Sequence, residues 1–203
     1  MAETGSPNCY VIDRDELDPD FPTQFQSTEL WEELGRTVSS FGFLEEMLGK
    51  AIYALTGTEE FDPEGAPEAF NNWIKTLEKA LTGTLGALII RYAQALSENQ
   101  RTKGNDCSDQ IAGLEQAKDI RNALCHGSWG KPDHEGRTVP KFVNRKLAIF
   151  ELPVDCDFLR QTRAALRHMI CDVLDSVTSV GYQFPGSSSP GEQLWPHPAK
   201  VVL

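Results

Sequence analysis

Apolar residues recur at steps of three and four along most of residues 27–183, and this spacing predicts helices. The first stripe follows Ser27 or Thr28, either of which can cap a helix, and it ends near Thr56, before Gly57. We therefore expect one long helix in this stretch. Its apolar positions are Leu34, Val38, Phe41, Leu44, Leu48, Ile52 and Leu55.

Three further stripes predict helices over about 67–96, 108–126 and 155–182. Pro67 suits the first turn of the second helix. The apolar positions of the second and last helices are Phe70, Trp73, Ile74, Leu77, Leu81, Leu85, Leu88 and Ile89, and Phe158, Leu159, Ala165, Leu166, Ile170, Val173, Leu174 and Val177. Four substantial helices joined by short connections favour an all-α fold, an antiparallel bundle.

The chain outside these four helices divides into three segments. The run "KLAIFEL" after the third helix carries β-forming residues, which predicts a small β-hairpin insertion. Residues 1–26 contain three prolines and many acids, typical of an irregular lead-in, and residues 184–203 form a tail rich in Pro, Gly and Ser. The helical domain is therefore expected at residues 27–183.

Composition limits the compartment and the cofactors. No apolar run approaches the roughly 18 residues that cross a bilayer, and the acidic N-terminus lacks the basic start and apolar core of a secretory signal, so we expect a cytoplasmic protein. The five cysteines form no CxxC pair, which favours free reduced thiols over disulfides or zinc. No known metal-ligand spacing occurs, so no metal or other cofactor is expected.

The distribution of charge is more informative than its total. A net charge of −11 argues against a general nucleic-acid binder. Residues 118–168, however, hold ten Lys and Arg against six Asp and Glu, whereas the remainder holds nine against twenty-four. This basic segment indicates one site for an anionic ligand, although a chance fluctuation in surface charge explains the same numbers equally well.

The stretch "IRNALCHG" at 120–127 places three polar side chains at the end of the third predicted helix. Arg121 falls inside the apolar arc of that helix, where an unpaired charge is costly to bury. Asn122 and His126 lie one turn apart on another side and can touch. Gly127 frees the backbone to bend, so that His126 can sit on the rim of the bundle beside Arg121.

These three side chains suit phosphodiester chemistry. Arginine offers a fixed fork of donors to phosphate oxygens and stays charged. Histidine exchanges a proton near neutral pH, and asparagine can orient the imidazole or hold the phosphate. No metal is needed if the nucleophile is the neighbouring 2′-hydroxyl of RNA.

The run "RNALCH" resembles the R-(polar)-x3-H signature of HEPN domains, whose fold is a bundle of about four helices with the motif at the end of a late helix. The resemblance covers the motif and the helix layout of residues 27–183. It implies a metal-independent endoribonuclease acting as a homodimer with two facing motifs, in toxin–antitoxin or antiviral defence systems. Arg121 would bind the scissile phosphate, His126 would be the general acid or base, and Asn122 would support them.

Two details qualify the resemblance. The run "RAALRH", from Arg163 to His168, also satisfies a bare R-x4-H pattern, but it lacks the polar second residue and sits mid-helix, so we interpret it as coincidence. HEPN toxins controlled by a nucleotidyltransferase antitoxin carry a tyrosine where this chain has Ser128. Modification by that type of antitoxin is therefore in doubt, whereas another antitoxin or a regulatory protein is a partner that the resemblance allows.

Several residues near the motif have two interpretations. Basic side chains form either a track for an RNA backbone or an ordinary solvated face paired with local acids. Trp129 either stacks on a base or packs against the bundle, and Glu45 and Glu46 either pair with Arg121 or lie at the surface. The candidate RNA-binding residues are Lys131, Lys141, Arg145, Lys146, Arg160, Arg163 and Arg167.

Three hypotheses follow. The first is a HEPN-type ribonuclease that leaves a 2′,3′-cyclic phosphate and acts as a toxin or in antiviral defence. The second is a non-catalytic HEPN-like bundle that binds a protein, RNA or nucleotide, with Arg121 as a structural ion pair and His126 placed against the helix dipole. The third is an unrelated four-helix regulator in which the motif arose by chance.

Overall fold

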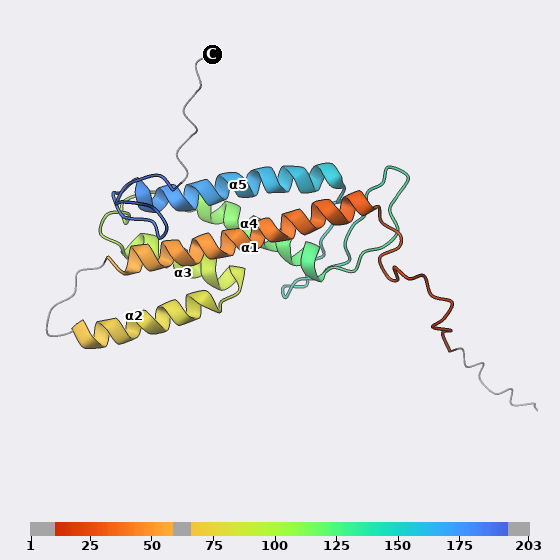
Figure 1. Cartoon of the computed structure of the whole chain (residues 1–203), viewed down its shortest axis with the longest axis horizontal. Coiled ribbons are helices and arrows are strands. Elements are labelled where there is room, and N and C mark those ends of the chain that lie inside the picture. Colours follow the sequence, from red (N-terminus) through yellow and green to blue (C-terminus); the bar gives the residue numbers. More distant parts are fainter. Residues whose placement is uncertain (1–10, 59–65, 195–203) are drawn as a thin grey trace, which may run out of the picture.

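The structure, a computed structural model, describes residues 11–58 and 66–194 and is mostly helical (Figure 1). Within these ranges it has five helices and no strand. The helices are α1 (Thr28–Thr56), α2 (Ala66–Leu81), α3 (Leu85–Glu98), α4 (Ser108–His126) and α5 (Cys156–Thr178). No helix in the described part of the chain is long and apolar enough to cross a membrane.

Helix α1 has the bounds that its sequence predicts. The Oγ of Ser27 accepts a hydrogen bond from the backbone N–H of Leu30 at 3.1 Å, which satisfies one free donor of the first turn. Its apolar stripe is buried except at Val38, which is 37% exposed, contrary to our expectation. The helix contacts each of the other four helices, so it forms the centre of the fold.

The prediction of one helix over residues 67–96 is wrong, because the chain breaks between α2 and α3. Thr84 begins a new helix, and its Oγ1 accepts from the backbone N–H of Ala87 at 3.4 Å. Helix α2 lies on the outside of the molecule (Figure 1), where Phe70 is exposed rather than buried. It docks on α1 through Trp73, whose indole N–H donates to Thr56 Oγ1 at 3.1 Å. The side chains of Leu77 and Leu81 lie outside the described residues.

The additional reversal of the chain makes α1 and α5 parallel rather than antiparallel. Glu29 and Glu33, near the start of α1, contact Arg160, near the start of α5. Figure 1 shows both helices beginning at the same end of the molecule, and α5 makes its most extensive interface with α1. The expected four-helix antiparallel arrangement is therefore wrong for this central pair.

The core is shared by α1, α3, α4 and α5 and continues past the last helix. Phe184 is fully buried, and Leu194 packs against the core, so the packed region extends beyond the predicted boundary at residue 183. Ala165, expected to be buried, is exposed on α5. Residues 11–26 form no helix or strand. The larger buried side chains include Phe41, Leu44, Met47, Leu48, Ile52, Leu55, Leu85, Ile89, Tyr92, Leu114, Leu159 and Phe184.

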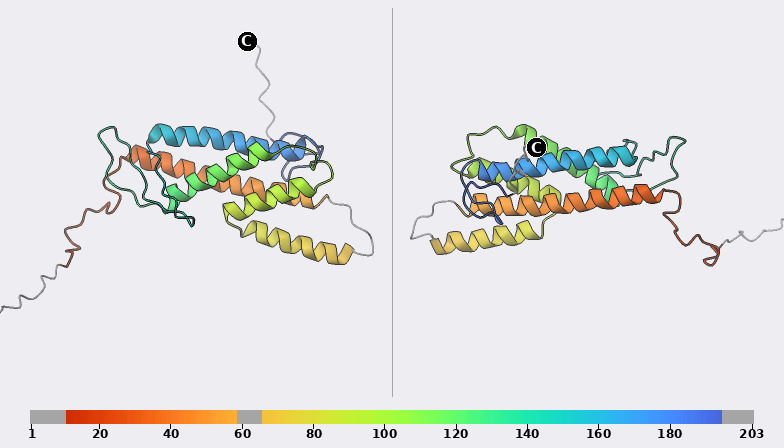
Figure 2. Two further views of the ribbon diagram at one scale, coloured as in Figure 1. Left: turned by 180° about the vertical axis from the view of Figure 1, so that it is seen from behind. Right: turned by 45° about the horizontal axis from the view of Figure 1, so that its top comes forward.

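The β-hairpin predicted after α4 does not form strands in the described residues. Three isolated antiparallel bridges stand in its place, joining Ser128 to Lys141, Thr138 to Val154, and Val143 to Ile149. Pro140 has no backbone N–H and cannot donate a hydrogen bond to a neighbouring strand. The bridge at Lys141 is therefore not continued through residue 140 to the bridge at Thr138. We call the segment between α4 and α5, residues 127–155, the insertion. It lies at the end of the molecule where α4 ends and where α1 and α5 begin (Figure 2).

Candidate functional site

Helix α4 ends at Gly127, a position where the neighbouring atoms leave no room for a side chain. The backbone N–H of Gly127 donates to the carbonyl oxygen of Ala123 at 2.9 Å, and its φ of −73° suits any residue. A Cβ at this position would collide with that same oxygen and would lie 2.7 Å from Cβ of Pro140. The lack of a side chain at Gly127 therefore allows the insertion to approach the helix end. The wider range of backbone angles open to glycine is not used here, because its φ is an ordinary one.

The insertion is fixed to the helix end directly after His126. Ser128 and Lys141 exchange two backbone hydrogen bonds of 3.1 and 2.9 Å. Trp129 packs edge-to-face on Trp31 of α1 with ring centroids 5.6 Å apart, which supports the packing interpretation of this tryptophan. No feature of the sequence predicts the pairing of Ser128 with Lys141, because it joins residues far apart along the chain.

Arg121 brings the three motif side chains together. Its Nη1 donates to Asn122 Oδ1 at 3.3 Å and lies 3.4 Å from His126 Nε2. The expected contact between Asn122 and His126 is thus replaced by an arginine that contacts both. The Arg121 side chain is 28% exposed and His126 is exposed, so a solvent-borne ligand can reach them.

The contact between arginine and histidine depends on the histidine tautomer. A guanidinium only donates, so Nε2 of His126 can accept from Arg121 in the tautomer that carries its proton on Nδ1. A basic nitrogen therefore lies beside a permanent cation. This pairing can bind an anion and accept a proton from it.

Glu45 of α1 completes the surroundings of Arg121. Its Oε1 lies 3.6 Å from Arg121 Nη2, which is close enough for an ion pair and too long for a hydrogen bond. Among the described residues this buried oxygen has no hydrogen-bond partner. Glu46 pairs instead with Lys50 at 2.7 Å. Of the two acids that sequence reasoning offered to Arg121, the structure places Glu45 beside it.

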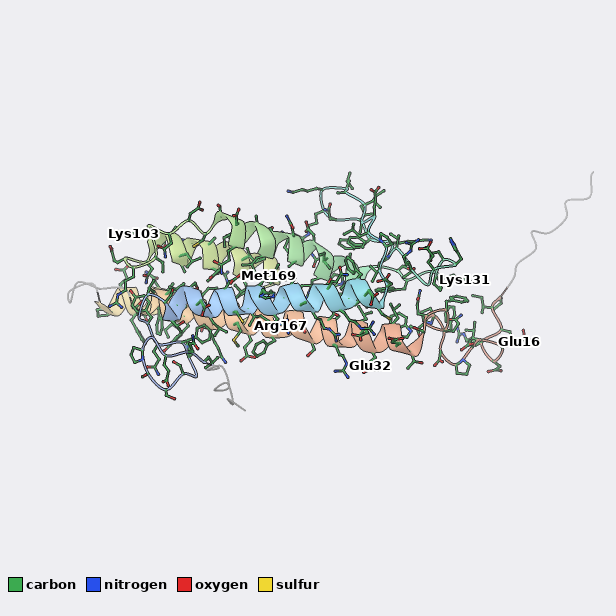
Figure 3. The ribbon with its side chains drawn as sticks, turned by 90° about the horizontal axis from the view of Figure 1, so that it is seen from above. Glu16, Glu32, Lys103, Lys131, Arg167 and Met169 are labelled. Carbon is green, nitrogen blue, oxygen red and sulfur yellow. The ribbon has the colours of Figure 1, made fainter. Side chains whose placement is uncertain are left out.

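The three arginines of α5 do not form a free basic track. Arg160 binds Glu29, Glu33 and Asp157 at 2.6, 3.0 and 3.0 Å, and the hydrogen bond with Glu29 is the largest cause that raises its pKa. Arg163 also pairs with Glu33. Arg167, labelled in Figure 3, is exposed without an ion pair among the described residues. The interpretation as a solvated face paired with local acids is therefore supported for two of the three.

The basic residues of the insertion differ in their availability. Lys131, at the right of Figure 3, has its Nζ 4.7 Å from the ring centroid of Phe25. Lys141, Arg145 and Lys146 are exposed, and none has an ion pair within the described part of the chain. Together with Lys131 and Arg167 these three are the candidate RNA-binding residues that have no ion pair with an acid among the described residues.

The remaining candidate groups do not assemble into a second site. The described residues hold no cluster of three or more His, Cys, Asp and Glu side chains that suits a metal ion. Cys107, Cys125, Cys156 and Cys171 carry free thiols, and Cys9 lies outside the described residues. Arg163 and His168, the second R-x4-H match, make no contact with each other in the described structure, since Arg163 is directed to Glu33.

Comparison with known proteins adds no relative, because no protein-family model, curated protein or solved structure matches the chain. Functional inference therefore rests on the geometry around Arg121 and on the resemblance of the motif.

Proposed function

We propose that the chain is a metal-independent endoribonuclease of the HEPN type, acting as a homodimer in antiviral defence or as a toxin. The observation that carries the proposal is the contact of Arg121 with both Asn122 and His126 at an accessible helix end. Arginine binds the scissile phosphate, histidine moves the proton, and Asn122 holds the guanidinium in place.

The proposed reaction needs only the RNA and these side chains. The 2′-oxygen attacks phosphorus while His126 accepts its proton, and the 5′-oxygen of the next nucleotide leaves with a proton from a second acid. The products are a 2′,3′-cyclic phosphate and a 5′-hydroxyl. Arg121 stabilises the negative charge that builds on the phosphorane oxygens. A second copy of the motif across a dimer interface would supply the second acid.

A specific observation favours a second candidate, a non-catalytic bundle that binds a protein, RNA or nucleotide partner. Glu45 already neutralises part of the charge of Arg121, and α1 acids occupy Arg160 and Arg163. A net charge of −11 further disfavours broad RNA affinity. In this alternative the Arg121 ion pair holds α1 and α4 together.

The first experiment compares wild type, His126→Ala and His168→Ala on labelled single-stranded RNA and tRNA in EDTA. His168 is the matched control, because it lies on α5, is exposed and belongs to the unassembled R-x4-H match. We expect cleavage by wild type and His168→Ala, with cyclic-phosphate ends, and a loss of about 100-fold or more in His126→Ala.

Folded wild-type protein that leaves every RNA intact would reject the ribonuclease in favour of the binding bundle. Equal losses in both histidine variants would also count against the proposed site, because only His126 contacts Arg121.

A further inference from the structure

The insertion presents an apolar and basic outer face. We call residues 139–150 the insertion ribbon. Pro140 is buried and Phe142, Asn144 and Phe150 are half-buried, whereas the other positions of the ribbon are exposed to solvent. The outward aliphatic residues are Val139, Val143, Leu147 and Ile149, of which Leu147 is 83% and Ile149 66% exposed.

Leu147 has an unfavourable backbone conformation for a leucine. Its φ of 61° lies in the left-handed region, which glycine and asparagine adopt far more readily than a leucine. The backbone N–H of Leu147 closes a turn by donating to the carbonyl oxygen of Asn144 at 2.9 Å, so the conformation belongs to this turn. The side chain is 83% exposed, contributes nothing to the core, and is available for a contact on the outer face.

The ribbon is also basic, and its Lys141 pairs through its backbone with Ser128 beside the candidate site. Residues 139–150 contain Lys141, Arg145 and Lys146 and no acid. None of the three cations has an ion pair among the described residues. A binding partner for this face therefore needs both negative charge and apolar side chains.

Residues 11–21, which we call the acidic segment, have this composition. They hold five Asp and Glu against one Arg, together with Val11, Ile12, Leu17 and Phe21, all exposed. The hydrogen bonds found for the segment in the described structure are local, such as Asp20 N–H to Asp18 Oδ1 at 2.8 Å and Phe21 N–H to the Asp18 carbonyl oxygen at 2.9 Å.

The segment is anchored beside the ribbon. Gln26 Nε2 donates to the carbonyl oxygen of Gly130 at 2.6 Å, and Phe25 lies under Lys131. The indole of Trp31 donates to the carbonyl oxygen of Thr23 at 3.2 Å. About twelve residues before this anchor can span about 40 Å when extended, whereas the seven residues from Lys141 to Leu147 turn back at Asn144 and span less than the roughly 20 Å of an extended chain.

We propose that the acidic segment docks in cis on the outer face of the insertion ribbon and competes with RNA for Lys141, Arg145 and Lys146. The apolar side chains of the segment cover Val143, Leu147 and Ile149, while its carboxylates pair with the three cations. The competition rests on the proposed ribonuclease function, whereas the docking itself does not. The segment would act as a built-in inhibitor of substrate binding.

The chain's own segment is favoured over that of a second copy because of its tether. A short connection gives an effective concentration in the millimolar range, which exceeds the concentration of an unassociated second copy in a dilute sample. The partner within the proposed homodimer is distinguished by the isotope test. Docking in trans remains a distinct outcome of the test below.

The docking is tested with a zero-length carbodiimide, which couples carboxylates to lysine amines only in direct contact. An equal mixture of ¹⁴N- and ¹⁵N-labelled full-length chains is unfolded in urea and refolded together, so that any dimers carry random labels. The sample is then treated and digested, and the linked peptides are identified by mass. We expect links from Asp13, Asp15, Glu16, Asp18 or Asp20 to Lys141 and Lys146, with both peptides carrying the same isotope.

The control variant is Leu147→Asn with Ile149→Thr, which keeps both lysines and all the acids. We expect its link yield to fall at least threefold, while its melting temperature does not fall below the wild-type value, because both positions are exposed and asparagine tolerates the left-handed backbone at residue 147. Links absent from Lys141 and Lys146, a mixed-isotope share near the half (about 50%) that random pairing in trans gives, or a yield unaffected by the variant would each overturn the proposal.

The competition is tested by the anisotropy of a labelled single-stranded RNA at low salt. Asp15→Asn, Glu16→Gln and Asp20→Asn together remove three charges from the acidic segment, and Glu78→Gln, Asp172→Asn and Asp175→Asn remove three elsewhere. We expect the first triple variant to bind RNA at least threefold more tightly than the second. Equal affinities would overturn the competition, and RNA binding by neither, with the links intact, would reject the RNA function while retaining the docking.

Discussion

Arg121 lies between an acid and a base at the end of α4. Glu45 Oε1 is 3.6 Å from its Nη2, and His126 Nε2 is 3.4 Å from its Nη1. A catalytic arginine and a structural arginine would both occupy such a place. They differ in what the protein loses when the side chain is removed, because a partly exposed ion pair contributes little to stability.

We expect Arg121→Ala to lower the free energy of unfolding by about 1 kcal/mol or less. Leu124→Ala, one turn closer to the helix end and fully buried, is expected to cost about 2–5 kcal/mol. Urea denaturation of both variants gives the comparison, and RNA cleavage by folded Arg121→Ala should be lost.

If Arg121→Ala destabilised the fold as much as Leu124→Ala does, the arginine would be structural. The binding bundle would then be the better account of the motif.

The end of α4 and the insertion behave as one element. Gly127 admits Pro140 against the last turn of the helix, and the two hydrogen bonds between Ser128 and Lys141 follow immediately. The position of His126 therefore depends on how closely the insertion approaches the helix. A side chain at residue 127 would separate them.

We expect Gly127→Ala to destabilise the protein by about 1–3 kcal/mol, because the added methyl group overpacks the contact with Ala123 and Pro140. Hydrogen exchange should also accelerate at the amides of Ser128 and Lys141. Gly130→Ala is the matched control, since nothing lies within 4 Å of a Cβ there. Equal effects of the two substitutions would show that the helix end does not need this close contact.

How far each element is predictable depends on the range of the interactions that define it. Helix α1 follows from local signals, since the Ser27 cap directly precedes it and a continuous apolar stripe lies within it. The break before Leu85 was missed, because the apolar spacing continues across it and the only local signal is the run Thr-Gly-Thr at 82–84. The clustering of Arg121, Asn122 and His126 was predictable from helix geometry. The pairing of Arg160 and Arg163 with Glu33 was not, because Glu33 comes from a helix more than a hundred residues away, whereas Asp157 lies within reach of Arg160 on α5 itself.

Three helices meet at one buried phenol in the middle of the molecule. The hydroxyl of Tyr92 on α3 donates to Ser176 Oγ on α5 at 2.8 Å and accepts from Gln110 Nε2 on α4 at 3.0 Å. Burial is the largest cause that raises the pKa of Tyr92 above its ordinary value of 10.0. The folded protein therefore keeps this phenol protonated at a pH where the unfolded chain has lost the proton.

This difference makes stability depend on pH in the alkaline range. The contribution of Tyr92 to the free energy of unfolding is fully present below about pH 10. Above that pH it declines by up to about 1.4 kcal/mol per pH unit, because the tyrosine ionises in the unfolded chain. We expect Tyr92→Phe to lower the free energy of unfolding by about 1–2 kcal/mol at neutral pH. Between about pH 10 and 11 the free energy of unfolding of the variant should fall less steeply than that of the wild type. Urea denaturation across this range measures both effects, and identical slopes for the two proteins would contradict the assignment.

The parallel arrangement of α1 and α5 also determines where a label or tether can be attached without covering the candidate site. Helix α1 has 29 residues and is about 43 Å long. Because α5 runs alongside in the same direction, the anchored residues before Thr28 and the last packed residues after Thr178 lie at opposite ends (Figure 1). A fluorescent label or surface tether attached after Leu194 would leave the Arg121 end open to a long polymer. The same tether placed before Phe21 would crowd it, and joining the two ends to permute the chain circularly would need a linker that spans the whole length of the molecule.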